Sequence, residues 1–297
     1  MSVVHNKSGG KPRKKDYRDF SHSKRFGLAS LIDLPLEYDV GLPMFIKDQG
    51  TTDLCAAMGS VAVSEDQEGV ELSAEWQFQK IKQLTGNWKA YGADPDSAIR
   101  ALKIGSLEQK DSPFTWQKNG RDFIANPLNW DRALEGKAER HRKVADYRVD
   151  GPYDHFNNIR SALYNSRGEK KSVLVGTRWL EGWNYTNGIV PREESTFITW
   201  HIYKIRGWKI KNGEPHLIAQ LSQGQSFGEN GLLYFPKEVI NREFSVRGSF
   251  ARTFGDDDPE EIKKRQWTLT QRIYDLMLTL LGELKTQLAL IKTKPVA

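Results

Sequence analysis

The distribution of apolar residues divides the chain into a helical first part and a strand-rich second part. Residues 54–63 are small and mostly apolar, a pattern typical of a helix that is buried on all sides. Two more helices are predicted after residues that commonly occupy the N-cap position, namely Ser73, and Asp94 or Asp96. These helices are expected to end near residues 84 and 104.

The second part of the chain carries β-branched and aromatic residues at short intervals. Strands are predicted over 172–177, 196–210 and 217–221. The dipeptide Asn212-Gly213, between the last two strands, is a strong signal for a two-residue hairpin turn. A helical part followed by a strand-rich part predicts an α+β fold with a cleft between the two halves.

A third pattern occupies residues 255–297. Acidic residues and Pro259 are typical of a helix start, and apolar residues then recur at intervals of three and four. This stripe consists of Leu269, Ile273, Leu276, Leu280, Leu284 and Leu288. Because exposing so many apolar side chains is unfavourable, we expect residues 259–292 to form a long amphipathic helix that mediates homo-oligomerisation or binds a protein partner.

Positive charge is concentrated at the beginning of the chain. The whole sequence of 297 residues has a formal net charge of +6, and residues 1–25 contain eight Lys/Arg against two acidic residues. We therefore expect residues 1–30 to be a flexible basic arm and residues 31–250 to be the globular domain. Within the arm, the segment 7–25 offers a weak contact for nucleic acid or another acidic surface.

Neither a membrane span nor a secretory signal is expected. The apolar stretches are shorter than the roughly 18 uncharged residues of a transmembrane helix, and the first fifteen residues lack the apolar core of a signal peptide. The single cysteine, Cys55, excludes an internal disulfide and a zinc finger. These features favour the cytoplasm or another reducing compartment.

Cys55 is also the candidate nucleophile. A lone cysteine is usually a small buried apolar residue, but Cys55 is predicted in the first turn of a helix that Asp53 could cap. The helix dipole lowers the pKa of a thiol at that position and favours the reactive thiolate. The side-chain amide of Gln49 could donate a hydrogen bond to a developing oxyanion. His201, inside a predicted strand, is the candidate base, although a lone histidine in a strand is more often a core residue.

Five segments, in chain order, resemble the papain-like cysteine peptidases. They are 47–55 (Lys-Asp-Gln-Gly-Thr-Thr-Asp-Leu-Cys), Leu72-Ser73 with the glycines at 86 and 92, 188–190 (Gly-Ile-Val), 201–208 (His-Ile-Tyr-Lys-Ile-Arg-Gly-Trp) and 222–231 (Ser-Gln-Gly-Gln-Ser-Phe-Gly-Glu-Asn-Gly). The resemblance covers about 31–245. It implies a helical half that carries Cys55 and a β-rich half that carries His201.

The resemblance also implies an activity. Cys55 and His201 would form a thiolate–imidazolium pair that hydrolyses peptide bonds, and Gln49 would belong to the oxyanion hole. The substrate would be a protein or a peptide. No cofactor and no metal are expected.

Two residues depart from the family pattern next to the predicted base. The asparagine that orients the catalytic histidine in the family aligns with Leu221, and the tryptophan that shields it aligns with Gln223. A leucine side chain cannot accept a hydrogen bond from an imidazole. Asn212 and Ser222 are alternative orienting residues, and Asn212 falls at the predicted hairpin turn.

Two functions therefore remain open. One is a cysteine endopeptidase whose activity is slowed by the missing orienting amide. The other is a non-catalytic structural or interaction protein on a papain-like scaffold, such as a virion component of a phage or a mobile element, which a basic arm and an oligomerising helix would suit. Reaction of Cys55 with a thiol-directed peptidyl electrophile at neutral pH would favour the peptidase.

Overall fold

The computed structural model describes residues 10–13, 20–42, 44–169, 171–185 and 188–256, together with residues 273 and 277. The chain divides into two compact units, Met1–Gly255 and Asp256–Ala297. The predicted helix over 259–292 lies outside the described residues, except for Ile273 and Met277, which are helical and exposed.

Three buried helices form the centre of the helical half. Two of them end within one residue of the predicted positions 84 and 104, and the first runs past the predicted 63 to Glu68. The Ser73 hydroxyl accepts the N–H of Trp76, and the Asp94 carboxylate accepts the N–H of Ser97, so both predicted caps are confirmed. The helices are α2 (Cys55–Glu68), α3 (Ala74–Thr85), α4 (Pro95–Ile104) and the shorter α5 (Trp116–Asn119), α6 (Arg121–Ala125) and α7 (Glu135–Ala138). No helix in the described part of the chain is both long and apolar enough to cross a membrane.

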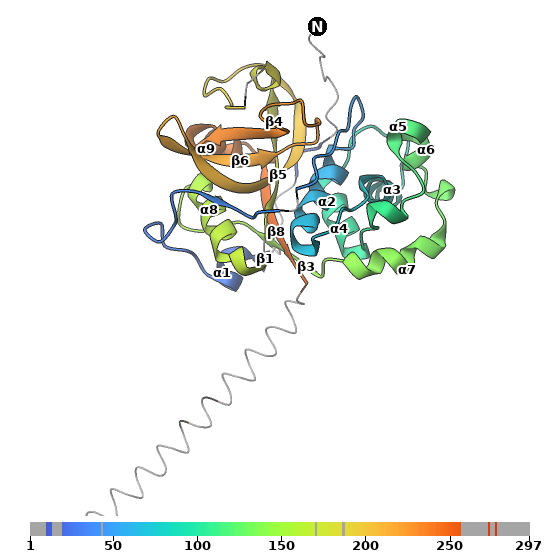
Figure 1. Ribbon diagram of the computed structural model, residues 1–297, viewed down its shortest axis with the longest axis horizontal. Coiled ribbons are helices and arrows are strands. Elements are labelled where there is room, and N and C mark those ends of the chain that lie inside the picture. Colours follow the sequence, from blue (N-terminus) through green and yellow to red (C-terminus); the bar gives the residue numbers. More distant parts are fainter. Residues whose placement is uncertain are drawn as a thin grey trace, which may run out of the picture. The chain divides into compact units, whose positions relative to one another are not determined.

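The second half is built on one sheet with the strand order β1-β3-β8-β4-β5-β6-β7, and β2 pairs with β5. Its strands are β1 (Phe20–Ser21), β2 (Tyr38–Asp39), β3 (Ala145–Arg148), β4 (Val173–Leu180), β5 (Phe197–Lys211), β6 (Glu214–Gln220), β7 (Leu232–Pro236) and β8 (Phe250–Gly255). Helices α1 (His22–Phe26), α8 (His155–Asn165) and α9 (Lys237–Ser245) accompany it. Figure 1 shows α3 to α7 on one side of α2 and the strands on the other.

The predicted strands and hairpin are confirmed. β5 and β6 are antiparallel and pair as far as Lys211 with Glu214. Asn212 and Gly213 between them have φ angles of 52° and 82°. Positive φ at both central residues is the conformation that an Asn-Gly hairpin turn requires.

Residues 20–26 pack on the main body of the chain. β1 pairs with β3, and the ring of Phe26 in α1 lies 5.0 Å from the ring of Tyr147. His22 is buried in the same region. These aromatic contacts hold residues 20–26, which charge alone had assigned to the basic arm. At the other end, β8 extends the sheet to Gly255, beyond the predicted boundary at 250.

The two halves meet where α2 lies against β5. A Cβ atom on Gly59 would lie 3.2 Å from the carbonyl oxygen of Ile202, tighter than most such contacts, so glycine favours this close approach of the helix. One turn further, the buried Lys204 ammonium donates to the Ala62 carbonyl and to the Asp66 carboxylate at 2.9 Å. This buried ion pair fixes β5 along the helix.

Candidate active site

Cys55 is the first residue of α2 and is fully buried. The N-cap residue is Leu54, and no side chain of the described chain caps the helix. The first N–H groups of a helix have no acceptor inside the helix, and they concentrate the positive end of its dipole. The thiol therefore stands where negative charge on a sulfur or an oxygen is favoured.

Asp53 has a different role from the predicted helix cap. Its carboxylate is completely buried, binds Arg121 through Nε at 2.9 Å and Nη2 at 3.0 Å, and lies 3.4 Å from the Lys82 ammonium. It also accepts the N–H of Gly92 at 2.6 Å. Burial raises the pKa of Asp53, but the bonds from Arg121 and the charge of Lys82 outweigh it and leave the pKa lowered. Because Asp53 is used here, it cannot cap α2, and the cap prediction is wrong.

The Gln49 amide is held in one orientation. Its Oε1 accepts the hydroxyl of Ser222 at 2.6 Å, and its Nε2 donates to the Thr52 carbonyl at 3.1 Å. The backbone reinforces this, since the Gln49 N–H donates to the Ser222 carbonyl at 2.8 Å. An amide nitrogen has two N–H groups, so one remains to bind a ligand on the loop that precedes Cys55.

His201 lies on the face of β5 opposite to Ile202 and is fully buried. Its ring packs against Trp179, at a centroid distance of 4.8 Å, and against Tyr203, at 6.0 Å. Neither ring nitrogen has a hydrogen-bond partner in the described part of the chain. Burial without a polar partner lowers the pKa of His201 to about 3, so the imidazole is neutral near pH 7.

The packing of α2 on β5 does not turn the His201 ring towards Cys55, because α2 packs on the face of β5 that carries Ile202 and Lys204. Gly59 lies beside Ile202, and Ala62 beside Lys204. Going back one helical turn from Gly59 moves about 6 Å along α2, which corresponds to roughly two residues of a strand. The start of α2 is therefore level with Trp200 of β5, and the His201 ring, on the other face of the strand, makes no hydrogen bond to the Cys55 thiol.

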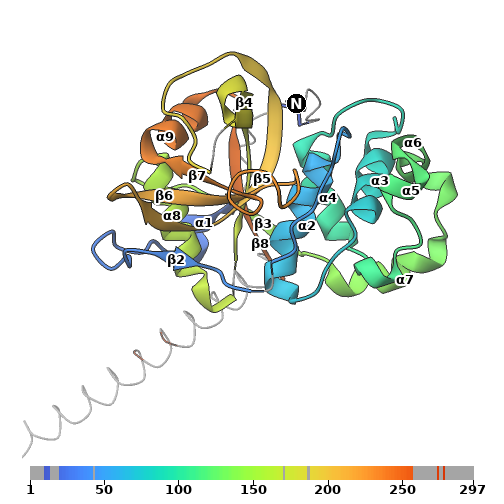
Figure 2. The ribbon, with the colours of Figure 1, turned by 45° about the horizontal axis from the view of Figure 1, so that its top comes forward.

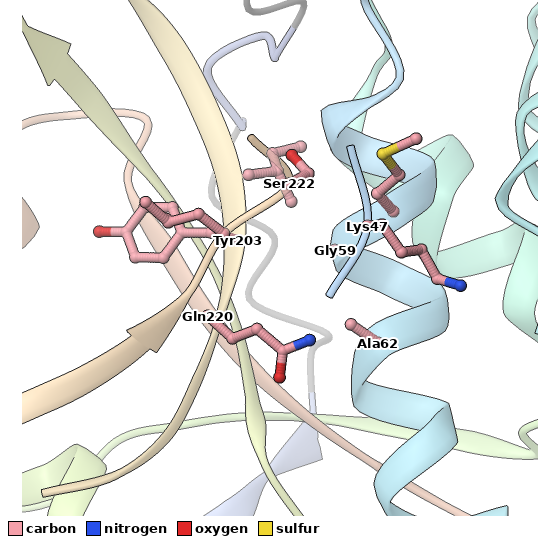
Figure 3. Close-up of a pocket in the computed structure, with 9 residues that line it drawn as sticks. Lys47, Gly59, Ala62, Tyr203, Gln220 and Ser222 are labelled. Carbon is pink, nitrogen blue, oxygen red and sulfur yellow. The ribbon is translucent and has the colours of Figure 1, made fainter. Parts of the chain in front are cut away.

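None of the candidate orienting residues binds His201. Asn212 is exposed at the hairpin turn, and the Ser222 hydroxyl is directed to Gln49. Leu221 is 3% exposed and lines a small cavity of about 10 Å³ with Tyr203 and Ser222. Figure 3 shows this cavity beside α2, with the Tyr203 ring directed away from the helix.

An unpredicted segment, residues 10–13, passes between the two halves. Gly10 forms bridges with Ala93 of the helical half and with Trp200 of β5, whose carbonyl accepts the Gly10 N–H at 3.1 Å. Arg13 continues the path through an ion pair with Asp96. Figure 2 shows the two halves that these bridges join, with β5 on one side of α2 and α3 and α4 on the other. The basic composition of residues 1–25 gave no signal for this position.

The sequence analysis also missed Trp179, Arg121 and Lys82, which contact predicted site residues. Each is far in the sequence from the residue that it contacts, and none belongs to a recognised motif. Their residue types are compatible with many buried sites, and only the folded chain shows which residue each of them contacts.

Comparison with known proteins identifies the fold. The profile of the papain family cysteine proteases matches residues 39–247. Xylellain, a cysteine protease from Xylella fastidiosa, has a similar structure with a TM-score of 0.67 and 19% identity, over 84% of this chain and 96% of that one. ProCathepsin B S9 from Trypanosoma congolense gives a TM-score of 0.61 and 16% identity, over 86% and 88% of the two chains.

Bromelain from Ananas comosus, solved in complex with the E64 inhibitor, gives a TM-score of 0.55 and 16% identity, over 75% of this chain and all of that one. A search of curated protein sequences found no match. The structural similarities confirm the predicted papain-like α+β fold with a helical and a β-rich half.

Proposed function

Because the chain belongs to the papain family of cysteine proteases, we propose that it hydrolyses peptide bonds with Cys55 as nucleophile, His201 as base and Gln49 as oxyanion donor. The observation that carries this proposal is that Cys55 starts α2 six residues after a Gln49 amide that Ser222 and Thr52 hold in place. The nucleophile and the oxyanion donor then lie within seven consecutive residues, on the loop before α2 and on its first residue.

The proposed reaction proceeds by acyl transfer. The thiol proton of Cys55 passes to His201 as the sulfur attacks the peptide carbonyl, and the oxyanion is stabilised by Gln49 and the Cys55 N–H. His201 then protonates the leaving amine, which leaves a thioester on Cys55. A water molecule, deprotonated by His201, hydrolyses the thioester and restores the thiol. Because burial lowers the pKa of His201 to about 3, the imidazole is neutral at rest rather than the imidazolium expected from the family resemblance.

Removing the oxyanion donor should slow the reaction. We expect Gln49→Ala to lower kcat by about 10²-fold, as is typical for one such donor. Ser222→Ala should give a smaller loss with the same KM, because it frees the amide without removing it. Steady-state kinetics of both variants test this, and an unchanged kcat in Gln49→Ala would remove Gln49 from the site.

Restoring an orienting amide should increase activity. Leu221→Asn places an acceptor at the position that the family resemblance gives to the orienting asparagine, and His201 has no polar partner in the described chain. We expect kcat to rise, with Leu221→Met as the control that keeps the site apolar at similar volume. A fall in kcat of Leu221→Asn, with the melting temperature unchanged, would contradict this prediction.

Residues 10–13 should compete with the substrate. The Gly10 N–H binds the carbonyl oxygen of Trp200, the residue next to His201. A peptide that binds along this part of β5 must therefore displace the segment. Gly10→Val should release the segment, because a Cβ there would lie 2.9 Å from the Trp200 carbonyl oxygen. If the segment fills the cleft in nine molecules of ten, KM should fall about tenfold.

The control for Gly10→Val is Gly136→Val, where a Cβ meets no atom within 4 Å. KM values of the two variants and of a chain that begins at Phe20 provide the measurement. An unchanged KM in both Gly10→Val and the shortened chain would show that the segment does not compete.

Three further proposals are supported by the sequence pattern alone. They are an oligomerising or partner-binding helix over 259–292, a weak contact of residues 7–25 with nucleic acid or another acidic surface, and a location in the cytoplasm, in another reducing compartment or in a virion. The non-catalytic alternative stays testable through the reactivity of Cys55, as described in the Discussion.

A further inference from the structure

The peptide group between Asp48 and Gln49 is held from both halves of the molecule. Its carbonyl oxygen, on Asp48, accepts the indole N–H of Trp116 at 2.9 Å. Its N–H, on Gln49, donates to the carbonyl oxygen of Ser222 at 2.8 Å. Because the C=O and the N–H of a planar trans peptide point in opposite directions, these two bonds reach the group from opposite sides. They therefore fix the plane of the peptide group from which the Gln49 side chain extends.

The ring of Trp116 also covers the next residue of the loop. Gly50 has a φ of 52°, and a Cβ atom there would lie 2.5 Å from Cη2 and 3.0 Å from Cζ2 of the Trp116 ring. A side chain at this position has no room, so the ring lies directly on the main chain of Gly50. Trp116 therefore contacts the residue before Gln49 through its N–H and the residue after it through its ring.

Trp116 is itself held in the helical half. It is the first residue of α5, and its backbone N–H donates to the Glu75 carboxylate at 3.4 Å. Glu75 belongs to α3 and is buried, and its other oxygen accepts the Ser73 hydroxyl at 3.2 Å. The partly buried indole packs against the core around α2, α3 and α4. Trp116 thus gives the loop a support that belongs to the core.

The remaining bonds of the loop are local. Thr52 donates to the Gln49 carbonyl through its N–H at 3.0 Å and through its hydroxyl at 2.6 Å, and the Gly50 N–H donates to the Asp48 carboxylate at 2.8 Å. These bonds join residues within one short turn, so they set its shape and not its place relative to α3 and α5. The bonds to Trp116 and Ser222 are the ones that place the peptide group next to Gln49.

We propose that Trp116 is a positioning residue for Gln49 and keeps the second N–H of its amide at the place where the oxyanion forms. This inference rests on the proposed function, in which Gln49 stabilises the oxyanion. An oxyanion donor acts through preorganised geometry, and a displacement of about 1 Å can cost about a hundredfold in rate. Trp116 does not react or touch the substrate in this role, since it acts through the main chain on either side of Gln49.

The test compares Trp116→Phe, which removes the indole N–H and keeps a ring, with Trp116→Ala, which removes both contacts. Trp130→Phe is the matched control, because the Trp130 indole also donates to a carbonyl oxygen at 2.9 Å, but to that of Ile124 in α6 rather than to the loop. For each variant, kcat and KM are measured with a peptide substrate, in the parent and in the Gln49→Ala background. Hydrogen exchange of the Gln49 and Thr52 N–H groups is followed by NMR, because it reports opening of the loop and does not depend on turnover.

We expect Trp116→Phe to speed exchange of both N–H groups about fivefold, the effect of losing one hydrogen bond, and Trp116→Ala to speed it further. The value of kcat should fall about fivefold to tenfold in Trp116→Phe and up to about a hundredfold in Trp116→Ala. KM should stay the same, because the oxyanion forms only after the substrate has bound. In the Gln49→Ala background both substitutions should lower kcat no further, since no amide remains to be positioned. Trp130→Phe should alter neither the exchange of the loop nor kcat.

Unchanged exchange of the Gln49 and Thr52 N–H groups in folded Trp116→Phe and Trp116→Ala would overturn the inference. A fall in kcat of the same size in the Gln49→Ala background, or an equal change in Trp130→Phe, would also overturn it, because either would show a general loosening of the helical half. If Trp116→Ala does not fold, Trp116→Phe provides both measurements. Full activity of Cys55→Ala, or a parent protein that hydrolyses no peptide, would instead refute the proposed function, and the exchange rates would still decide whether Trp116 holds the loop.

Discussion

Replacing Cys55 with alanine is expected to abolish peptide hydrolysis. Loss of the nucleophile in a comparable acyl-transfer site lowers kcat by about 10⁶-fold. Cys55→Ala should still fold, because it trims one buried atom at the start of α2, where Ala56 and Ala57 follow. The measurement is turnover of a peptide substrate, together with mass spectrometry of the protein after treatment with a peptidyl epoxide.

The parent protein should gain one inhibitor mass and Cys55→Ala none. Activity retained by Cys55→Ala would refute the mechanism, whereas a parent thiol that stays unlabelled in the folded protein would favour the non-catalytic scaffold. The pH dependence of alkylation by iodoacetamide adds a check. Burial keeps His201 neutral, with its pKa lowered to about 3. The alkylation rate should therefore rise in one step with pH, without the second, constant rate at acidic pH that a thiolate–imidazolium pair would produce.

Replacing Asp53 with asparagine is expected to cause the largest loss of stability. Asp53 is fully buried and neutralises Arg121 and Lys82, whose side chains are 14% and 1% exposed. Leaving such charges buried without their partner costs about 3–5 kcal/mol. For a domain of this size, this corresponds to a fall in melting temperature of roughly 6–20 °C.

The exposed neighbour Asp122 provides the matched control. It binds the same Arg121 guanidinium at 2.7 Å, but its side chain is 76% exposed. Asp122→Asn should therefore change the unfolding free energy by about 1 kcal/mol or less. Urea unfolding of both variants measures the two free energies of unfolding. An equal decrease in Asp53→Asn and Asp122→Asn would show that burial of Asp53 adds nothing to the stability that the ion pair provides.

The effect of Asp53→Asn should also depend on pH. The folded-state pKa of Asp53 lies below its ordinary value of 3.8. Its contribution to stability is therefore complete above that value and is lost as the pH falls through the folded-state pKa. The difference between the parent and the variant should shrink in strong acid, which unfolding curves at neutral and acidic pH measure.

Local signals in the sequence determined most of the secondary structure. Ser73 and Asp94 begin helices because each side-chain oxygen accepts the N–H of the residue three positions later. This bond lies within four consecutive residues, so the local sequence is enough to predict it. Asn212-Gly213 forms the hairpin because both residues accept positive φ. The five short segments that include Cys55 and His201 likewise predicted the fold, because they occur in the same order along the chain as in the papain-like cysteine peptidases.

Only the tertiary structure decided which partners the site residues have. Asp53 binds Arg121, 68 residues away, and not the helix that follows it, while Ser222 binds Gln49 across 173 residues. Trp179 reaches His201 because it lies two residues along β4 from Thr177, which pairs with His201, and Gly10 reaches Trp200 between the two halves. A cap or a turn depends on neighbouring residues and can be read locally, but these contacts depend on how distant elements pack, which no short pattern encodes.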